Sequence, residues 1–400
     1  MPPNTSSPLG SISETAYMHR WCLGVWTVFL VHASINIAWA LSNPSTEGID
    51  VSNHLLFALE FHDEFGKIWR NGNASFWGRM EGSLALFQAA GVYWPRLLYL
   101  FSVPFLGLAG RSILAFKLST LPFLLMLLLS TFGIGRRLGG VRVGFFSALL
   151  VSLCPLVFEA SRQYSLDLPL TAFVALGVLL LIRSQGLAHT REAVLLGLTM
   201  GFGMLFKGQL VLYLFWPVAF VAVLGIWNRF QGTPSAQSHA GRGTRSSIWR
   251  FALILGLVAG ATAVPASLHW GPKLTWALAE LRIHAADKLK ATEGTYTGAP
   301  GTAAFYLWHT AFLFGHSAGP PLFLLSIVGF FSALRRRRRS AVPSLMLLTV
   351  LPGLLLFSFF LGVKQGRFLM PILPFLAIAA ASLLWRPGAG ARMRPWRIGL

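Results

Sequence analysis

Long apolar runs recur along the chain from Trp21 to Trp385, and they constrain the fold more than any other feature. An α-helix needs roughly 20 apolar residues to cross a hydrocarbon core of about 30 Å, and these runs approach or reach that length. Of the 400 residues, 54% are hydrophobic and only 12% are charged, a balance that water-soluble domains do not show. We therefore expect an all-α integral membrane protein.

The formal net charge of +20 does not indicate nucleic acid as a partner, because the basic residues form short clusters between apolar runs. Lys and Arg in short loops stay on the cytoplasmic side of a membrane. The clusters expected on that side are Arg136, Arg137 and Arg142; Arg183 and Arg191; Arg229, Arg242, Arg245 and Arg250; Arg335 to Arg339; and the tail from Arg386. They predict a multi-pass protein of the cell inner membrane with both termini in the cytoplasm.

This orientation predicts about ten membrane-spanning helices. The expected ranges are 21–41, 113–134, 142–160, 167–183, 193–206, 209–227, 251–269, 320–334, 341–361 and 368–385. The segment 97–110 is left out, because counting it as a crossing would put the arginines at 136–137 and at 335–339 on opposite sides. Its 14 residues and Pro104 favour a re-entrant or interfacial helix instead.

The expected organisation is one membrane domain with short ends. Its parts are a cytoplasmic lead 1–19, a transmembrane domain 20–385 and a basic cytoplasmic tail 386–400, with a first outer loop 42–96, a cytoplasmic connector 228–249 and a second outer segment 270–319 inside the domain. In the first outer loop, NHLLFALEFHDEFGKIW and ASFWGRMEGSLALFQ have apolar residues at helical spacing. They predict amphipathic helices that lie on the membrane surface.

Charged residues on the outer side are costly near hydrocarbon and are commonly functional. The stretch RQYSLDLPL places Arg162 and Asp167 there, between two apolar runs. The other outer charges are Glu47, Asp50, Asp63, Glu64, Arg96, Glu159, Lys207, Lys364 and Arg367. Such a set could bind a lipid-linked phosphate through its cations while one carboxylate deprotonates an acceptor. The alternative is a group of interfacial side chains that reach for water and pair with one another.

Four motifs follow the acidic first outer loop in the order YWPRLLYL, YSLDLPL, GFGMLFKG and GRFLMPILPFLAI. Their order and sidedness resemble the GT-C membrane glycosyltransferases, above all the protein mannosyltransferase and aminoarabinose transferase group. The resemblance extends over residues 20–385. It implies an enzyme that moves a sugar from a polyprenyl phosphate donor to a lipid, polysaccharide or protein acceptor on the outer face.

The resemblance also implies roles for acidic residues. The family's catalytic acid lies in the first outer loop and acts on the acceptor as general base, or orients it. It corresponds to Asp50, and the later pair Asp63 and Glu64 is the alternative and a candidate for substrate binding. Asp167 matches the second acidic motif and would support that acid or help to hold the phosphate. A Mg²⁺ or Mn²⁺ ion bound by Asp50 and Asp167 is a candidate cofactor, and His54 is a candidate substrate-binding residue.

Basic and aromatic positions complete the expected site. Lys207 and Arg367 match family residues that bind the donor phosphate, and Arg96 is a third candidate, although here it follows the proline that the family's basic residue precedes. Lys364, in the same KQGRF stretch as Arg367, is a further candidate phosphate ligand. Candidate substrate-binding residues are Tyr93, Tyr99, Arg162 and Tyr164.

Two other functions fit part of the pattern. A transporter or flippase for a lipid-linked or anionic substrate would place its site near the bilayer midplane and show internal repeats, and no repeat is visible. A non-catalytic membrane scaffold would tolerate loss of the outer charges. The chain also has no glycine-rich strand-to-helix motif for a nucleotide sugar, which favours a lipid-linked donor.

Overall fold

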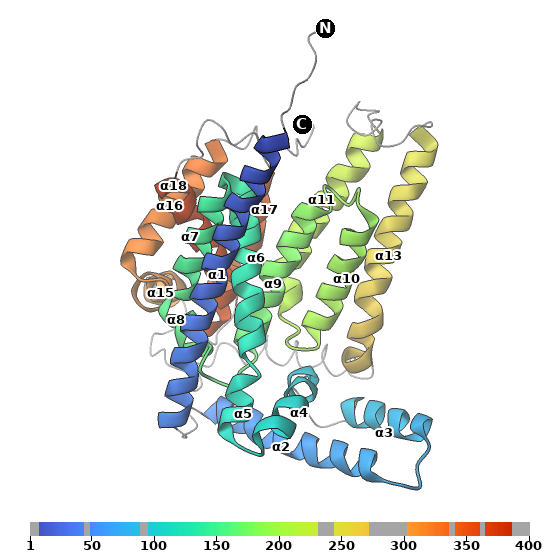
Figure 1. Cartoon of the computed structure of the whole chain (residues 1–400). Coiled ribbons are helices and arrows are strands. Elements are labelled where there is room, and N and C mark those ends of the chain that lie inside the picture. The colour runs from blue at the N-terminus through green and yellow to red at the C-terminus, as the bar shows by residue number, and fades with distance from the viewer. Residues whose placement is uncertain are drawn as a thin grey trace.

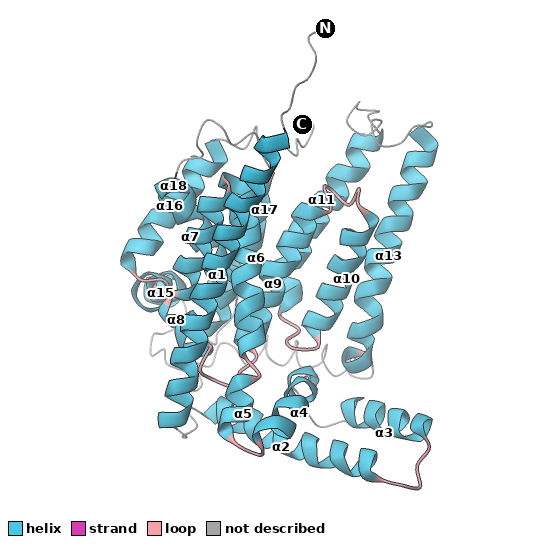
Figure 2. Ribbon diagram, in the orientation of Figure 1, coloured by secondary structure: helices cyan, strands magenta, loops and turns pink. Residues whose placement is uncertain are grey.

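The computed structural model describes residues 8–43, 49–88, 95–230, 244–271, 302–335, 341–360 and 365–385. Within these ranges every regular element is a helix and none is a strand (Figure 2). The prediction of an all-α membrane protein is therefore confirmed.

Most of the described helices lie side by side in a bundle (Figure 1). They are α1 (Pro8–Ser42), α6 (Leu121–Gly139), α7 (Val141–Ser152), α9 (Asp167–Arg183), α10 (Thr190–Met204), α11 (Leu210–Phe230), α13 (Thr244–Trp270), α16 (Pro320–Arg335), α17 (Val342–Leu355) and α18 (Leu373–Leu384). The span Gly366–Leu384 is 72% buried inside the protein, whereas His19–Ser42 is only 22% buried. Helix α18 therefore belongs to the centre of the bundle and α1 to its periphery.

A second group of helices lies at one end of the bundle, below it in Figure 1. They are α2 (Ile49–Arg70), α3 (Phe76–Gln88), α4 (Leu97–Ala109) and α5 (Ile113–Leu118). On α3, the side chains of Trp77, Met80 and Leu84 are exposed at the spacing of one helical face. This face agrees with the predicted amphipathic surface helix. Helix α4 has 13 residues and packs against α2 and α5, as expected for an interfacial helix that does not cross the membrane.

The predicted number of about ten spans is not confirmed. Among the described residues, six helices are long and apolar enough to cross a membrane, or up to seven if the bent pair Tyr306–Ser317 and Pro320–Arg335 forms one span. The expected span 142–160 is divided, because α7 ends at Ser152 and a short helix, α8 (Pro155–Ala160), starts anew at a proline. Helices α9 and α10 have 17 and 15 residues. At about 1.5 Å per residue they are shorter than a core of about 30 Å.

Several helices extend into segments that the sequence suggested were irregular. Helix α1 begins at Pro8, within the expected lead 1–19. Helices α11 and α13 enter the expected connector from both sides, and residues 231–243 lie outside the described ranges. The second outer segment contains α15 (Ala303–Phe312) and the π-helix η1 (Leu313–Ser317).

Many basic residues lie at one end of the bundle. The last turns of α6, α9 and α16 carry arginines, and these turns lie at the upper end in Figure 1, opposite α2 to α5. Because Lys and Arg favour the cytoplasmic side, the upper end is the predicted cytoplasmic end. We call the opposite end, where α9 and α11 begin, the outer end.

Candidate active site

Asp167 and Lys207 form a buried ion pair at the outer end. Lys207 Nζ donates a hydrogen bond to Asp167 Oδ1 at 2.6 Å, and the two side chains retain only 6% and 7% of their exposure. Ion pairs are costly to bury, and removing one partner leaves an uncompensated charge in a medium of low dielectric constant. The two residues that the sequence placed in separate motifs therefore form one unit.

Local structure explains how each partner is held. Asp167 is the first residue of α9, where the helix dipole favours a negative charge. The hydroxyl of Thr171, one turn later, donates to the backbone carbonyl of Asp167 at 2.8 Å. Lys207 lies in the tight turn between α10 and α11, and its amide donates to Gly203 O at 3.0 Å.

Gly208, the residue after Lys207, lies where the turn between α10 and α11 approaches the end of α13 closely. A Cβ atom at Gly208 would lie 2.7 Å from the ring of Trp270, at the end of α13. The indole Nε1 of Trp270 donates to Met204 O at 3.1 Å, which binds α13 to the end of α10. The Lys-Gly sequence thus lets the turn pack tightly behind the ion pair.

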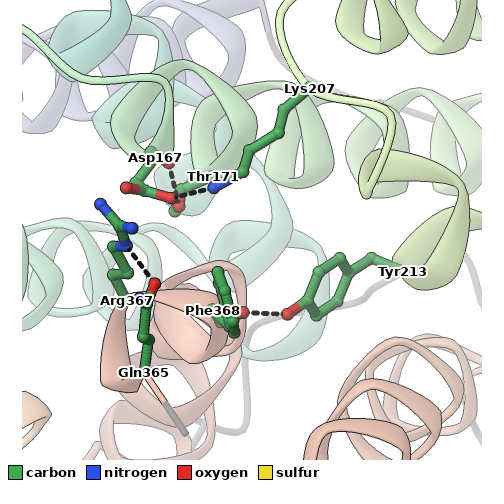
Figure 3. Close-up of polar contacts among 7 residues, drawn as sticks. All are labelled: Asp167, Thr171, Lys207, Tyr213, Gln365, Arg367 and Phe368. Atoms are coloured by element: carbon green, nitrogen blue, oxygen red, sulfur yellow. Dashed lines mark hydrogen bonds and ion pairs between the residues drawn. The ribbon is translucent and has the colours of Figure 1, made fainter. Parts of the chain in front are cut away.

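A 3₁₀-helix, η4 (Gly366–Ile372), forms the next side of the site (Figure 3). Arg367 Nε donates to Gln365 Oε1 at 2.8 Å, and Figure 3 shows its guanidinium group directed toward Asp167. The ammonium group of Lys207 lies 5.4 Å from the centre of the Phe368 ring, a cation–π distance. The hydroxyl of Tyr213, on α11, donates to Phe368 O. Two predicted phosphate ligands, Lys207 and Arg367, therefore both lie near the Phe368 ring.

Three neighbours of the site were not predicted from the sequence. Gln365 and Phe368 orient or contact the cations, and Tyr213 holds η4 against α11. Gln365 and Phe368 lie in KQGRF, the stretch that was selected for its charges. Their closeness to Arg367 in the sequence could therefore have indicated that they belong to the site. Tyr213 lies in an apolar helix, and nothing in its local sequence separates it from a packing residue.

The predicted residues His54, Tyr99 and Tyr164 connect the outer helices. His54 Nδ1 lies 2.9 Å from the Tyr99 hydroxyl, which ties α2 to α4. The Tyr164 hydroxyl donates to Leu98 O at 3.2 Å and to Ser102 Oγ at 3.1 Å, which ties the loop before α9 to α4. Burial raises the pKa of Tyr99 and of Tyr164, so both phenols stay protonated at neutral pH.

Arg96 and Arg162 are held by the protein itself. Arg96 donates to Leu86 O and lies 6.0 Å from the Phe61 ring, and burial lowers the pKa of its guanidinium group. Arg162 donates to Asn36 Oδ1 at 3.3 Å and lies 3.8 Å from the Phe158 ring. The contacts of both arginines are with the backbone, an amide group and aromatic rings of the outer end.

Asp63 and Glu64 lie on the surface of α2. Asp63 Oδ2 accepts from Arg111 Nη2 at 2.7 Å, and Glu64 Oε1 accepts from Lys67 Nζ at 2.5 Å. The carboxylate side chains are 43% and 46% exposed. Both of these first-loop acids are therefore paired in contact with solvent.

Other predicted positions lie partly or wholly outside the described residues. Asp50 is the second residue of α2, one turn before His54, but its side chain is not described. Tyr93 and Lys364 lie outside the described ranges. Among the residues that are described, no three His, Cys, Asp or Glu side chains come together to hold a metal ion. The metal site on Asp50 and Asp167 stays a prediction.

Solved structures with the same arrangement of helices belong to membrane sugar transferases. The chain aligns with ArnT from Cupriavidus metallidurans in the apo state with a TM-score of 0.60 and 16% identity, over 91% of this chain and 60% of that one. The ArnT structure bound to undecaprenyl phosphate gives a TM-score of 0.56, also at 16% identity, over 92% and 60%. The fold is that of the GT-C superfamily of membrane glycosyltransferases, as the order of the motifs predicts.

A more distant member of the same class is the oligosaccharyltransferase AglB from Archaeoglobus fulgidus. Its complex with an inhibitory peptide and a dolichol-phosphate aligns with a TM-score of 0.52 and 14% identity, over 90% of this chain and 50% of that one. The chain thus spans 60% of the ArnT chain and half of the AglB chain.

At the level of sequence, residues 95–237 match the family described as dolichyl-phosphate-mannose-protein mannosyltransferase. This stretch contains both Asp167 and Lys207, whereas Asp50 and Arg367 fall outside it. No curated protein sequence matches the chain significantly.

Proposed function

We propose that this protein is a glycosyltransferase that moves a sugar from a polyprenyl phosphate-linked donor to an acceptor on the outer face of the membrane. The observation that carries the proposal is the buried pair of Lys207 and Asp167 at the outer end of the bundle. An almost completely buried ammonium group beside a carboxylate is costly in free energy, which favours a functional reason for it.

The donor phosphate would bind between Lys207 and Arg367. A lysine ammonium group has three N–H donors, and Asp167 Oδ1 accepts one of them, so the others are suited to phosphate oxygens. Arg367, whose guanidinium group lies 6.0 Å from the centre of the Phe368 ring, would add a second cation. The carboxylate of Asp167 would hold Lys207 in place and keep it charged.

The reaction needs a base and a stabilised leaving group. An acceptor hydroxyl oxygen forms a bond to the anomeric carbon of the sugar, and the bond from that carbon to the donor phosphate oxygen breaks. The hydroxyl proton passes to a carboxylate of the first outer loop, for which we propose Asp50. The polyprenyl phosphate leaves with its negative charge offset by Lys207 and Arg367.

The neighbouring structures support this choice of donor. ArnT has been solved with undecaprenyl phosphate and AglB with a dolichol-phosphate and a peptide, so related folds bind a polyprenyl phosphate. By analogy, the donor here carries a polyprenyl phosphate, and the acceptor is a lipid, polysaccharide or protein. No step is assigned to a metal ion, because Lys207 already supplies positive charge next to Asp167.

The test measures transfer of radiolabelled sugar from polyprenyl phosphate donors by the purified protein in liposomes. We expect Asp50→Asn, Asp167→Asn and Lys207→Gln each to lower the rate by about 10²-fold or more. Glu192→Gln is the matched control, because α10 begins at the basic end of the bundle, away from the ion pair. This variant should transfer sugar at the wild-type rate.

Other results would redirect the proposal. Normal transfer in a folded Asp50→Asn, Asp167→Asn double variant would rule out the proposed site. Loss of transfer with Asp63→Asn but not with Asp50→Asn would move the base to Asp63. Movement of the lipid-linked sugar across the liposome membrane without transfer to any acceptor would favour a flippase.

A further inference from the structure

A cavity of about 540 Å³ lies between α6 and α9, and the proposed reaction makes no use of it. On α6, its walls include Leu125, Leu129 and Gly133, which recur every four residues along one face. On α9 they include Leu176 and Leu179. Leu129 is 38% exposed, so this apolar wall is not fully covered by the protein.

The two helices approach closely along this cavity. A Cβ atom at Gly133 would lie 2.9 Å from Leu179 Cδ1, so glycine lets α6 and α9 pack together at the base of the cavity. The mainly apolar part of the wall extends from Pro122 to Gly133 on α6, a length of about 17 Å at 1.5 Å per residue, and Ser130 is its one polar side chain. A long apolar chain would therefore find mostly apolar contact along the helix pair.

One end of the cavity is strongly basic. Arg136, Arg137 and Arg183 all line it, and its described lining contains no Asp or Glu. Arg136 and Arg137 are in the last turn of α6, and Arg183 is in the last turn of α9. The preference of arginine for the cytoplasmic side, which sets the orientation of a membrane protein, explains arginines in the loops of that side. It does not by itself explain why three arginines line one end of the same cavity.

We propose that this cavity is a binding site for an anionic glycerophospholipid of the cytoplasmic leaflet. The phosphate head group would bind the three arginines, and an acyl chain would lie along the apolar wall of α6 and α9. Basic pockets between membrane helices on this side bind anionic head groups through the same combination of charge and apolar contact.

The length of the cavity favours a lipid of one leaflet over a polyprenyl phosphate. One leaflet contributes about half of a hydrocarbon core of about 30 Å, and the mainly apolar wall of about 17 Å is sufficient for such a chain. A polyprenyl chain is longer than one leaflet. Arg183 ends α9 and Asp167 begins it, so the basic end of the cavity lies opposite the Asp167 and Lys207 pair, where the sugar donor is proposed to react.

The experiment measures which lipids the purified full chain retains. The protein is reconstituted in nanodiscs of equal parts phosphatidylglycerol and phosphatidylcholine, and bound lipid is counted by native mass spectrometry after release. We expect the wild-type protein to retain phosphatidylglycerol preferentially. The Arg136→Gln, Arg137→Gln, Arg183→Gln variant should lower that retention by about tenfold or more.

Two further variants separate binding from general effects of charge and folding. Arg142→Gln, Arg191→Gln, Arg250→Gln removes the same number of positive charges from outside the lining and should retain the lipid. Leu129→Trp fills the apolar wall, leaves every charge in place and should lower retention, and the partial exposure of Leu129 makes the substitution tolerable.

Several outcomes would overturn the proposal. Equal retention of the two lipids by the wild-type protein would do so, as would unchanged retention in both the lining variant and Leu129→Trp. Displacement of phosphatidylglycerol by an equal amount of polyprenyl phosphate would show that the occupant is wrong. Lipid retention is measured without sugar transfer. The test of the lipid site is therefore independent of the test of the proposed enzymatic function.

Discussion

Two ion pairs at the outer end have almost the same contact distance and very different surroundings. Lys207 and Asp167 lie 2.6 Å apart with side chains that are 6% and 7% exposed. Arg111 and Asp63 lie 2.7 Å apart with side chains that are 53% and 43% exposed. Water screens the pair of Arg111 and Asp63 and can solvate either side chain alone. The buried pair of Lys207 and Asp167 has no water to solvate one partner if the other is removed. Burial, and not the contact distance, therefore distinguishes the candidate active site.

The largest expected effect comes from removing one partner of the buried pair. Lys207→Gln leaves the Asp167 carboxylate buried without its cation and should destabilise the protein by roughly 3–5 kcal/mol. Arg111→Gln should leave stability unchanged within error. Thermal unfolding of the purified proteins in detergent measures both.

A double variant makes this comparison stricter. Asp167→Asn combined with Lys207→Gln should cost less than the sum of the two single variants, because no charge then remains unpaired. Strict additivity would contradict the assignment of the two residues to one unit. Sugar transfer should stay low in all three variants, since the cation is lost or displaced.

The second effect comes from the close approach of η4 to α15. A Cβ atom at Gly366 would overlap the Phe312 ring, whereas a Cβ atom at Gly107 on α4 meets nothing within 4 Å. Gly366→Ala should cost about 1–3 kcal/mol through overpacking and should also lower transfer, because η4 carries Arg367. Gly107→Ala is the control, and an equal effect of both substitutions on stability would disprove the steric explanation.

A smaller effect is expected at the contact between α2 and α4. Tyr99→Phe removes the hydroxyl that lies 2.9 Å from His54 Nδ1 and should cost about 0.5–1.5 kcal/mol. In a His54→Leu background, the same substitution should cost clearly less, because the partner is already gone. Equal costs in the two backgrounds would show that the two side chains do not interact.

The smallest effect concerns the pH dependence of the exposed pair. The hydrogen bond from Arg111 lowers the pKa of Asp63, so any stabilisation is present at neutral pH and is lost as the pH falls through that lowered pKa. The pair lies in water, so Asp63→Asn should follow the wild-type thermal midpoint from pH 7 down to acid conditions. A separation of several degrees at neutral pH that closes in acid would show that the exposed pair matters after all.

The sequence predicted the class of protein and several residues of the site. Apolar runs and arginine clusters indicated an all-α membrane protein, and the order of the motifs indicated a GT-C fold. Asp167, Lys207 and Arg367 were each selected as costly charges near hydrocarbon. Such predictions are possible because hydrophobicity, charge and motif order are properties of short stretches of chain.

Other features depended on how the helices end and on how they meet. The predicted number of about ten spans is not confirmed, because α7 stops at Ser152 and α9 and α10 are short, which apolar composition does not reveal. The pairing of Asp167 with Lys207 joins residues far apart in sequence and depends on α9, α10 and α11 packing together. The contact of Tyr213 with η4 likewise joins residues far apart in sequence.

By itself, then, the amino-acid sequence determined that the chain enters a membrane as helices, which end of the bundle is basic, and which residue types occur near the outer surface. Only the tertiary structure decided which charges are buried as a pair, which are exposed on α2, and where α6 and α9 leave a cavity with arginines at its mouth. The physical reason is that burial and contact arise from packing between segments distant in sequence, whereas hydrophobicity and charge are local.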